Sequence, residues 1–218
     1  MKKIVLAALA MVSALFWSSP TFGQGAYLIV NDGANISSLI GLEGVSPKVD
    51  LYSEIGIGCR FNSTLGLEFG AAWSAQGATY IDKGLRYTYN YNYLNIPLLF
   101  TVSIPKHITL LVGAQAGAFL DATYAYEMPS VLNSGTILGE GKFDKSEFHP
   151  WDFGATLGVR YLAVPKLGLG IEMRYTMGIT QTHNGVSDSL SGRPHISVPD
   201  NRNSVFRLGV FINIPITK

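Results

Sequence analysis

The chain has 218 residues, of which 14% are charged, and its formal net charge at pH 7 is +1. So low and balanced a charge gives no electrostatic basis for binding nucleic acid. The single cysteine, Cys59, excludes a disulfide within one chain, and the four histidines lack the close spacing of metal ligands, so we expect no metal and no cofactor.

Residues 1–23 have the pattern of a secretory signal peptide. Two lysines precede an uncharged apolar run over residues 4–17, and small residues follow up to Gly23. The apolar run is shorter than the roughly 20 residues that a membrane-spanning helix needs. We therefore expect cleavage after Gly23, which leaves residues 24–218 as one domain.

The remainder of the chain contains eight segments in which apolar and polar residues alternate, as they do in strands with two different faces. The clearest is 64–76, where every second residue from Leu65 to Ala75 is apolar and Glu68 lies on the opposite face. The apolar face over 94–102 covers nine residues, enough for a tilted strand to span a bilayer. In chain order the segments cover residues 25–37, 49–61, 64–76, 87–102, 107–122, 148–163, 166–181 and 203–216.

The connections between these segments alternate in length. Short turns on one rim and long loops on the other are typical of outer-membrane barrels. We therefore predict an all-β fold, an up-and-down antiparallel eight-stranded transmembrane β-barrel in the cell outer membrane, with both termini in the periplasm. Pro97 and Pro215 each remove a ladder donor, which predicts local bulges. The tight connections lie around 62–63, 104–106 and 164–166, and the longer ones at 38–48, 79–86, 123–147 and 182–202.

Charged side chains gather on the faces opposite the apolar ones. In an eight-stranded barrel these side chains point into a lumen narrow enough for them to fill. Because unpaired buried charges are costly, we expect four acidic and four basic residues to neutralise one another. The alternative is a gated ion or proton path through the same residues. The predicted ion-pair network comprises Glu54, Arg60, Glu68, Asp152, Arg160, Glu172, Arg174 and Arg207.

A second set of residues is aromatic and falls toward the rim with the longer loops. Aromatic rings at this level are typical of an interfacial girdle, and they would also suit a contact surface for glycans or a partner protein. Thr88, Asn90 and Asn92 are polar where lipid requires apolar groups, so this segment is expected to leave the membrane above Leu94. The predicted outer-rim aromatic residues are Trp73, Tyr80, Tyr87, Tyr89, Tyr91, Tyr93, Tyr124, Tyr126 and Trp151.

No spacing of a known catalytic site is present. Residues 183–189 include a histidine, two serines and an aspartate, and His149 lies near Asp152, but no nucleophile elbow accompanies them. We expect that the protein is not an enzyme and has no catalytic residues. Cys59 is expected on the lipid-facing side of its strand, where it would be a small inert hydrophobe.

Four stretches of the chain carry a family likeness: Tyr93–Leu99 (YLNIPLL), Phe153–Gly158 (FGATLG), Gly168–Tyr175 (GLGIEMRY) and Asn203–Gly209 (NSVFRLG). In these stretches the sequence resembles the PorT-like, porin-like outer-membrane β-barrel family of Gram-negative bacteria. The resemblance implies an eight-stranded barrel but no shared activity, since some relatives are associated with protein secretion and most have no assigned role. The chain departs from the usual barrel ending, because its last two residues replace a terminal aromatic residue.

Together these features predict an integral outer-membrane β-barrel with a structural or interaction role, long extracellular loops and a lumen filled by side chains. Its expected partners are outer-membrane lipid and an envelope or secretion protein, and the barrel is expected to be monomeric. One alternative is a small pore or an accessory of transport or secretion. Another is a soluble secreted lipocalin-like binding protein, which would bury the leucines and expose the arginines.

Overall fold

The computed structural model describes residues 25–41, 44–82, 84–104, 107–129, 136–182 and 201–216. The predicted signal peptide, the segment 183–200 and the last two residues lie outside the described residues, and the predictions made for them stay predictions. Within the described ranges, no helix has the length and apolar character needed to cross a membrane.

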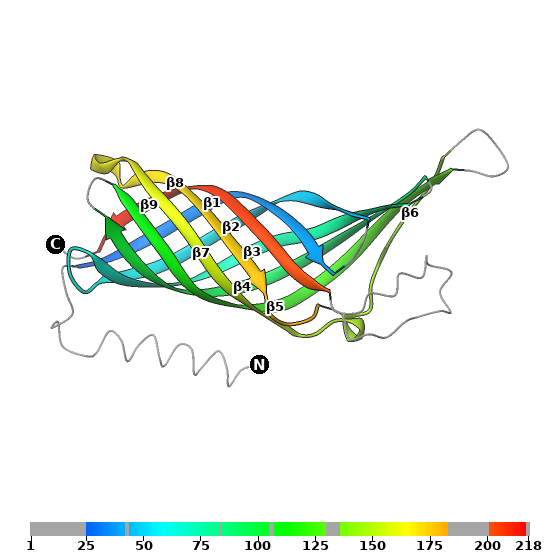
Figure 1. Cartoon of the computed structure of the whole chain (residues 1–218), viewed down its shortest axis with the longest axis horizontal. Helices are drawn as coiled ribbons and strands as arrows, with labels where there is room; N and C mark the ends of the chain where they lie inside the picture. Colours follow the sequence, from blue (N-terminus) through cyan, green and yellow to red (C-terminus); the bar gives the residue numbers. More distant parts are fainter. Residues whose placement is uncertain are drawn as a thin grey trace.

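The described chain forms nine antiparallel strands, eight of which close into a ring (Figure 1). Strands that follow one another in the chain pair with each other, except that β5 pairs with β7 in the ring, and β1 pairs with β9 to close it. Among the described residues, β6 pairs only with the outer part of β5. The predicted all-β, up-and-down, eight-stranded barrel is therefore confirmed. The strands are β1 (Gly25–Ile40), β2 (Val45–Arg60), β3 (Leu65–Asp82), β4 (Leu85–Ile104), β5 (Ile108–Pro129), β6 (Thr136–Lys142), β7 (Trp151–Val164), β8 (Leu169–Gly178) and β9 (Arg202–Pro215).

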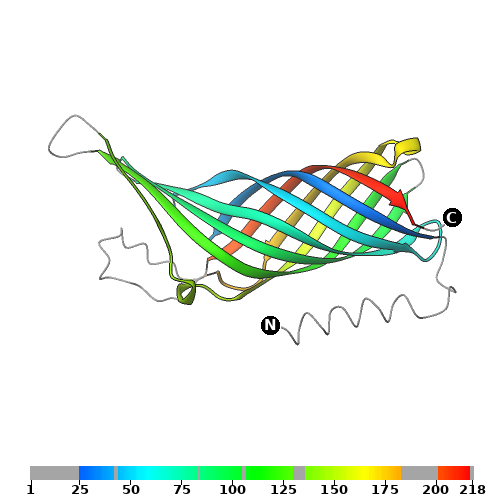
Figure 2. The same cartoon turned by 180° about the vertical axis from the view of Figure 1, so that it is seen from behind.

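The seam between β1 and β9 brings the two ends of the described chain together. Gly33 pairs with Gly209, and a Cβ atom on Gly33 would lie only 2.2 Å from the carbonyl oxygen of Leu208. Glycine at this position therefore lets the first and last strands approach closely. The start of β1 and the end of β9 lie at the same end of the barrel, which we call the terminal rim (Figure 2).

At the opposite end, β3, β4 and β5 continue well beyond the ring. The last pair between β5 and β7 joins Ala118 to Trp151, whereas the ladder between β4 and β5 continues to Arg86 and Glu127. This outward continuation, together with β6, forms a long twisted ribbon on one side of the barrel mouth (Figure 1). We call it the hairpin extension and define it as residues 75–82, 84–93, 119–129 and 136–142.

The hairpin extension corrects the predicted loop lengths. Residues predicted as long loops at 38–48, 79–86 and in the first part of 123–147 instead continue the strands, since β3 ends at Asp82 and β4 begins at Leu85. The reason is that alternation continues through 85–93, with tyrosine on one face and polar residues on the other. The short turns do lie together at the terminal rim, where the 3-10 helix η2 (Pro165–Leu167) joins β7 to β8.

The outer surface of the ring is apolar. Leu157, one of its residues, leaves 64% of its surface exposed, and Cys59 is exposed on the same side of the wall. This is the arrangement of a barrel surrounded by hydrocarbon, and the reverse of a lipocalin-like binder, whose apolar residues face inward. Representative outward residues from different strands are Ile55, Phe69, Leu98, Val112, Leu157, Met173 and Leu208.

The predicted bulges at Pro97 and Pro215 are wrong. The pairs Phe69–Leu98 and Ala72–Asn95 keep the same register on both sides of Pro97, and Gly70 across the ladder leaves room for the proline ring. A bulge occurs instead between β4 and β5, where Asn92 pairs with Asp121 but the next residue of β4 pairs with Phe119. The extra residue reverses which positions of β5 face inward, so Asp121 points outward and accepts a hydrogen bond from Asn92 at 2.7 Å.

Candidate functional site

Six charged side chains cross the lumen at the centre of the ring, and we call them the ionic belt. They face inward because each occupies the opposite parity to the lipid-facing residues of its own strand. Three are acidic and three are basic, so the belt has no net charge. The members are Glu54 on β2, Glu68 on β3, Arg160 on β7, Glu172 and Arg174 on β8, and Arg207 on β9.

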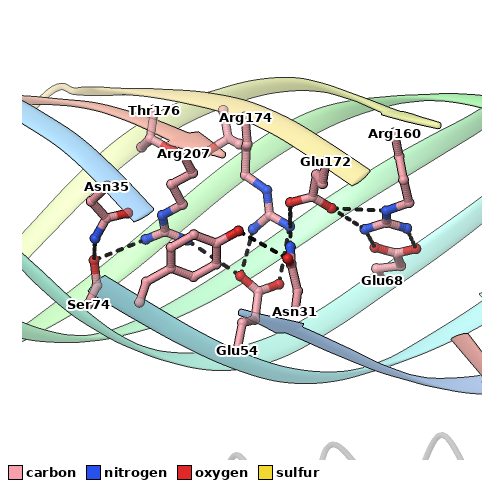
Figure 3. Close-up of polar contacts among 12 residues, drawn as sticks. Asn31, Asn35, Glu54, Glu68, Ser74, Arg160, Glu172, Arg174, Thr176 and Arg207 are labelled. Atoms are coloured by element: carbon pink, nitrogen blue, oxygen red, sulfur yellow. Dashed lines mark hydrogen bonds and ion pairs between the residues drawn. The ribbon is translucent and has the colours of Figure 1, made fainter. Parts of the chain in front are cut away.

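The belt is a continuous chain of ion pairs (Figure 3). Arg160 contacts Glu68 at 2.6 Å and Glu172 at 2.5 Å, and Arg174 contacts Glu172 at 2.6 Å. Arg174 also reaches Glu54 at 2.8 Å, and the same carboxylate lies 3.4 Å from Arg207. Arg174 and Arg207 occupy directly paired positions on β8 and β9, so the shared carboxylate of Glu54 offsets the repulsion between them.

Uncharged side chains add hydrogen bonds to the belt, although the Nε atoms of Arg174 and Arg207 are buried without a hydrogen-bond partner. Asn31 donates to Glu172 at 2.7 Å, the Tyr27 hydroxyl donates to Glu68 at 2.6 Å, and the Tyr52 hydroxyl donates to Asn31 at 3.0 Å. The guanidinium of Arg160 also lies 4.7 Å from the ring centre of Phe211. The belt side chains are at most 5% exposed, so their charges are satisfied within the protein rather than by water.

Two residues of the predicted network do not join the belt, which corrects the prediction of eight members. Asp152 lies nearer the hairpin extension, where it accepts hydrogen bonds from Asn203 at 2.7 Å and Thr180 at 2.9 Å. Arg60 lies at the terminal rim with an exposed side chain, and its guanidinium is 5.2 Å from the ring centre of Tyr27. Among the described residues neither forms an ion pair.

Aromatic side chains fill the barrel mouth beyond the belt, and we call them the aromatic column. The predicted girdle is wrong for the four alternating tyrosines of β4, which are at most 6% exposed and face inward. Their odd-numbered positions share parity with the lumen residue Asn95, whereas Leu94 and Leu98 face lipid. The column comprises Tyr87, Tyr89, Tyr91, Tyr93, Phe119, Tyr124, Tyr126, Phe143 and Phe148.

The rings of the column stack from the barrel mouth outward along the extension. Phe119 stacks on Phe148 with ring centres 4.6 Å apart, and Tyr87 stacks on Tyr124 at 5.5 Å. On β6, a Cβ atom on Gly139 would lie 2.2 Å from the ring of Tyr126, so glycine lets that ring lie across the strand. Aromatic pairs at these separations add stability beyond the burial of their area.

A short segment after β6 returns the chain to the barrel and supplies two of these rings. It contains the 3-10 helix η1 (Lys145–Glu147), which Asp144 caps by accepting a hydrogen bond from the Ser146 backbone at 3.0 Å. That hydrogen bond holds the pKa of Asp144 below its usual value. The side chain of Glu147 accepts from the Asp144 backbone in return, which completes a capping box. Phe148 then follows directly and is 2% exposed.

The remaining predicted aromatic residues divide between the two faces. Trp73 and Trp151 face outward with 45% and 37% of their surface exposed, as girdle residues do. Tyr80 is partly buried and packs against the aromatic column. No group of three potential metal ligands occurs in the part of the chain that the structure describes. Of the catalytic candidates, only His149 and Asp152 lie in the described residues, and the His149 backbone N–H donates to the carbonyl of Thr182.

Several residues that build the lumen carry no charge and were not singled out in the sequence. Tyr27, Asn31 and Tyr52 contact the belt, and Phe143 and Phe148 cover the barrel mouth. The first three share inward parity with the charged residues across the ladder, which is a signal available in the sequence. The two phenylalanines lie outside any strand, so alternation gives no signal for them.

Comparison with known proteins gives the following similarities. The family model described as "Outer membrane protein beta-barrel domain" matches residues 21–184. Among solved structures, Ail of Yersinia pestis has 12% identity and a TM-score of 0.46, covering 88% of this chain and 100% of its own. Neisserial surface protein A (NspA) has 11% identity and a TM-score of 0.44, covering 87% and 97%. CarO of Acinetobacter baumannii has 12% identity and a TM-score of 0.48, covering 85% and 96%. No curated protein matches the sequence.

Proposed function

Because the chain belongs to the outer membrane protein beta-barrel domain family, we propose that it serves as a lipid-embedded interaction platform of the outer membrane. The outer-membrane location follows from the family and agrees with the apolar outer surface of the ring. The proposal includes that the barrel is neither a wide pore nor an enzyme. It also includes the orientation, with the terminal rim in the periplasm and the hairpin extension outside the cell.

The hairpin extension is the observation that carries this proposal. Its outward face on β4 holds Thr88, Asn90 and Asn92, which are polar groups that lipid would not accommodate. At its tip Leu138 leaves 73% of its surface exposed, although it lies beyond the apolar wall of the ring. An ordered ribbon that projects beyond the ring offers both of its faces for contact with another molecule.

The ionic belt supports a filled lumen over a wide pore. Its side chains come from five strands on different sides of the ring and meet in contacts of 2.5–3.4 Å across the interior. Beyond it, Tyr91 and Phe148 are at most 2% exposed, so a second packed layer covers the belt toward the extension. An eight-stranded ring has room for such packing and little else.

Site-specific photo-crosslinking in intact cells tests the platform. A crosslinking side chain is placed at Leu138 on the extension or at Leu157, which is 64% exposed on the lipid-facing wall. We expect a discrete adduct with a macromolecule from Leu138 and adducts with lipid alone from Leu157. Recovery of the barrel without any adduct from Leu138 under growth conditions would contradict the proposal.

The alternative role as an accessory of transport or secretion is tested at the other rim. The PorT-like assignment, which we retain as a proposal, favours a periplasmic partner because some relatives are associated with secretion. A crosslinker at Leu167, which is 64% exposed on η2, samples that rim. A stoichiometric periplasmic protein captured from Leu167 but not from Leu138 would favour the accessory role over the surface platform.

A further inference from the structure

A pocket of about 360 Å³ lies at the terminal rim, apart from both the ionic belt and the aromatic column. It is lined by the first residues of β1, the last residue of β2, the η2 turn between β7 and β8, and the end of β9. It therefore lies at the seam between the first and last strands of the ring.

The charge of the pocket is positive and unbalanced. Arg60 and Lys166 both line it, and among the described residues no carboxylate does. Among the described residues, the Arg60 side chain forms no hydrogen bond or ion pair and has one ring contact, with Tyr27, and Lys166 has no polar partner. The excluded member of the predicted network is therefore a cation that faces a cavity.

The belt carboxylate that contacts Tyr27 is already occupied by other donors. Glu68 accepts two hydrogen bonds from Arg160, at 2.6 and 3.0 Å, and a third from the Tyr27 hydroxyl. The Tyr27 ring thus stands between the satisfied belt and the Arg60 guanidinium. A ligand in the pocket would meet the cation without competition from an internal acid.

A polar group of the pocket also lacks a partner. The Asn213 side-chain oxygen is buried without a hydrogen bond, although the Asn213 backbone donates to the Gly168 carbonyl at 2.9 Å. Rotation of the amide by half a turn presents its NH₂ group instead, so this side chain can serve as a donor or an acceptor. Asn213 lines the pocket and is partly buried, so its amide adds a neutral polar group beside the two cations.

Apolar side chains border the same pocket on the lipid side. Leu167 and Ile214 line it and leave 64% and 45% of their surface exposed. We propose that the terminal-rim pocket binds a phosphate group that carries no cation of its own, such as the headgroup of an anionic phospholipid, with Arg60 and Lys166 as its cationic contacts. An anionic phospholipid presents this group beside a hydrocarbon chain, and guanidinium and ammonium groups are the usual protein partners of phosphate. Assignment of the pocket to the periplasmic leaflet rests on the orientation proposed above; the binding chemistry does not.

The test uses the folded full-length mature barrel in an uncharged detergent, with bound lipid counted by native mass spectrometry. It is titrated with phosphatidylglycerol, with phosphatidylcholine and with inorganic phosphate. The rim variant carries Arg60→Gln and Lys166→Gln. The matched control carries Arg86→Gln and Lys142→Gln, which remove the same charge from the hairpin extension. Each variant is shown to be folded if the unboiled protein migrates on a denaturing gel as the unboiled wild type does.

We expect phosphatidylglycerol to bind more tightly than phosphatidylcholine, and the rim variant to bind it about tenfold more weakly while the control is unchanged. If inorganic phosphate binds the wild type but not the rim variant, and neither lipid is preferred, the site takes soluble phosphate. Equal binding of both lipids without phosphate binding, or equal loss in both variants, would overturn the proposal. None of these outcomes depends on crosslinking from Leu138, so failure of the platform and failure of the pocket are distinguishable.

Discussion

The ring and the hairpin extension share three strands but differ in chemistry on both faces. Within the ring, β4 points Leu94 and Leu98 outward and Asn95 inward. Within the extension, the same strand points Asn92 outward and Tyr91 inward. The change takes place within about four residues and coincides with the bulge between β4 and β5. One strand therefore has two kinds of surface along its length. The residues on its outer face suit lipid or water, and those on its inner face suit the side chains they pack against.

We expect the largest loss of stability when a buried carboxylate is removed, and almost none when an exposed one is removed. Glu172 lies between two arginines with its side chain fully buried, so Glu172→Ala leaves excess positive charge inside the ring. Breaking a buried pair in this way costs about 3–5 kcal/mol. We expect urea unfolding of the barrel in lipid vesicles to show this loss. Glu140→Ala on the extension should change the unfolding free energy by less than about 0.5 kcal/mol; similar losses in both variants would erase the distinction.

The second prediction compares the same substitution on two outer surfaces. Leu157→Arg places a charge on the lipid-facing wall, which costs about 2–4 kcal/mol near the bilayer midplane. Leu138→Arg places the same charge on the tip of the extension, in water. We expect the first variant to lose membrane assembly, measured as the folded fraction in isolated outer membranes, and the second to assemble normally. Equal assembly would mean that Leu157 does not face lipid.

The third prediction concerns the aromatic column. Phe148→Leu keeps an apolar side chain but removes the stack on Phe119, at a cost of about 1 kcal/mol. The effect should be local, so we expect faster proteolysis at 143–150 with little change in global unfolding. Phe153→Leu is the control, because Phe153 faces lipid with 49% of its surface exposed. If residues 143–150 are cleaved at the same rate in the Phe148 variant and in the control, the stack does not hold this segment in place.

The smallest effect is a pH dependence at the base of the extension. Because the pKa of Asp144 is lowered in the folded state, its cap contributes stability above the unfolded-state pKa and loses it as the pH falls through the folded-state value. We expect NMR titration of this carboxyl group to show the lowered pKa. We also expect proteolysis at 143–150 to become faster at low pH, and Asp144→Asn to abolish this acceleration. If the acceleration is unchanged in that variant, another titrating group is responsible for it.

The sequence predicted the strands and the lumen charges well because both follow from alternation. The position of a residue such as Arg174 in the alternation predicts which face it occupies, and its charge predicts that a buried partner of opposite charge lies nearby. Parity does not state height along the barrel axis, which depends on strand tilt and register. For this reason the predicted network included Arg60 and Asp152, which share the face of the belt but not its level.

The tyrosines of β4 show a second limit. Their parity places them on the inner face, whereas their aromatic composition alone suggests a girdle. The sequence does not show which side chains cover these tyrosines. In the structure Phe143 and Phe148 cover them, and both belong to a segment without a strand pattern. The bulge near Asn92 likewise has no marker such as glycine or proline at the inserted residue of β5.

The charges of the ionic belt are divided unequally between the early and the late strands of the ring. The belt residues of the early strands, Glu54 and Glu68, contribute two negative charges, whereas β7, β8 and β9 contribute three arginines and one glutamate, a net of two positive charges. Either part alone would carry uncompensated charge into hydrocarbon, but the two parts attract each other across 92 to 153 residues of chain. We therefore expect Arg207, on β9, to join the belt before the interior leaves water, so that ring closure and membrane entry occur together.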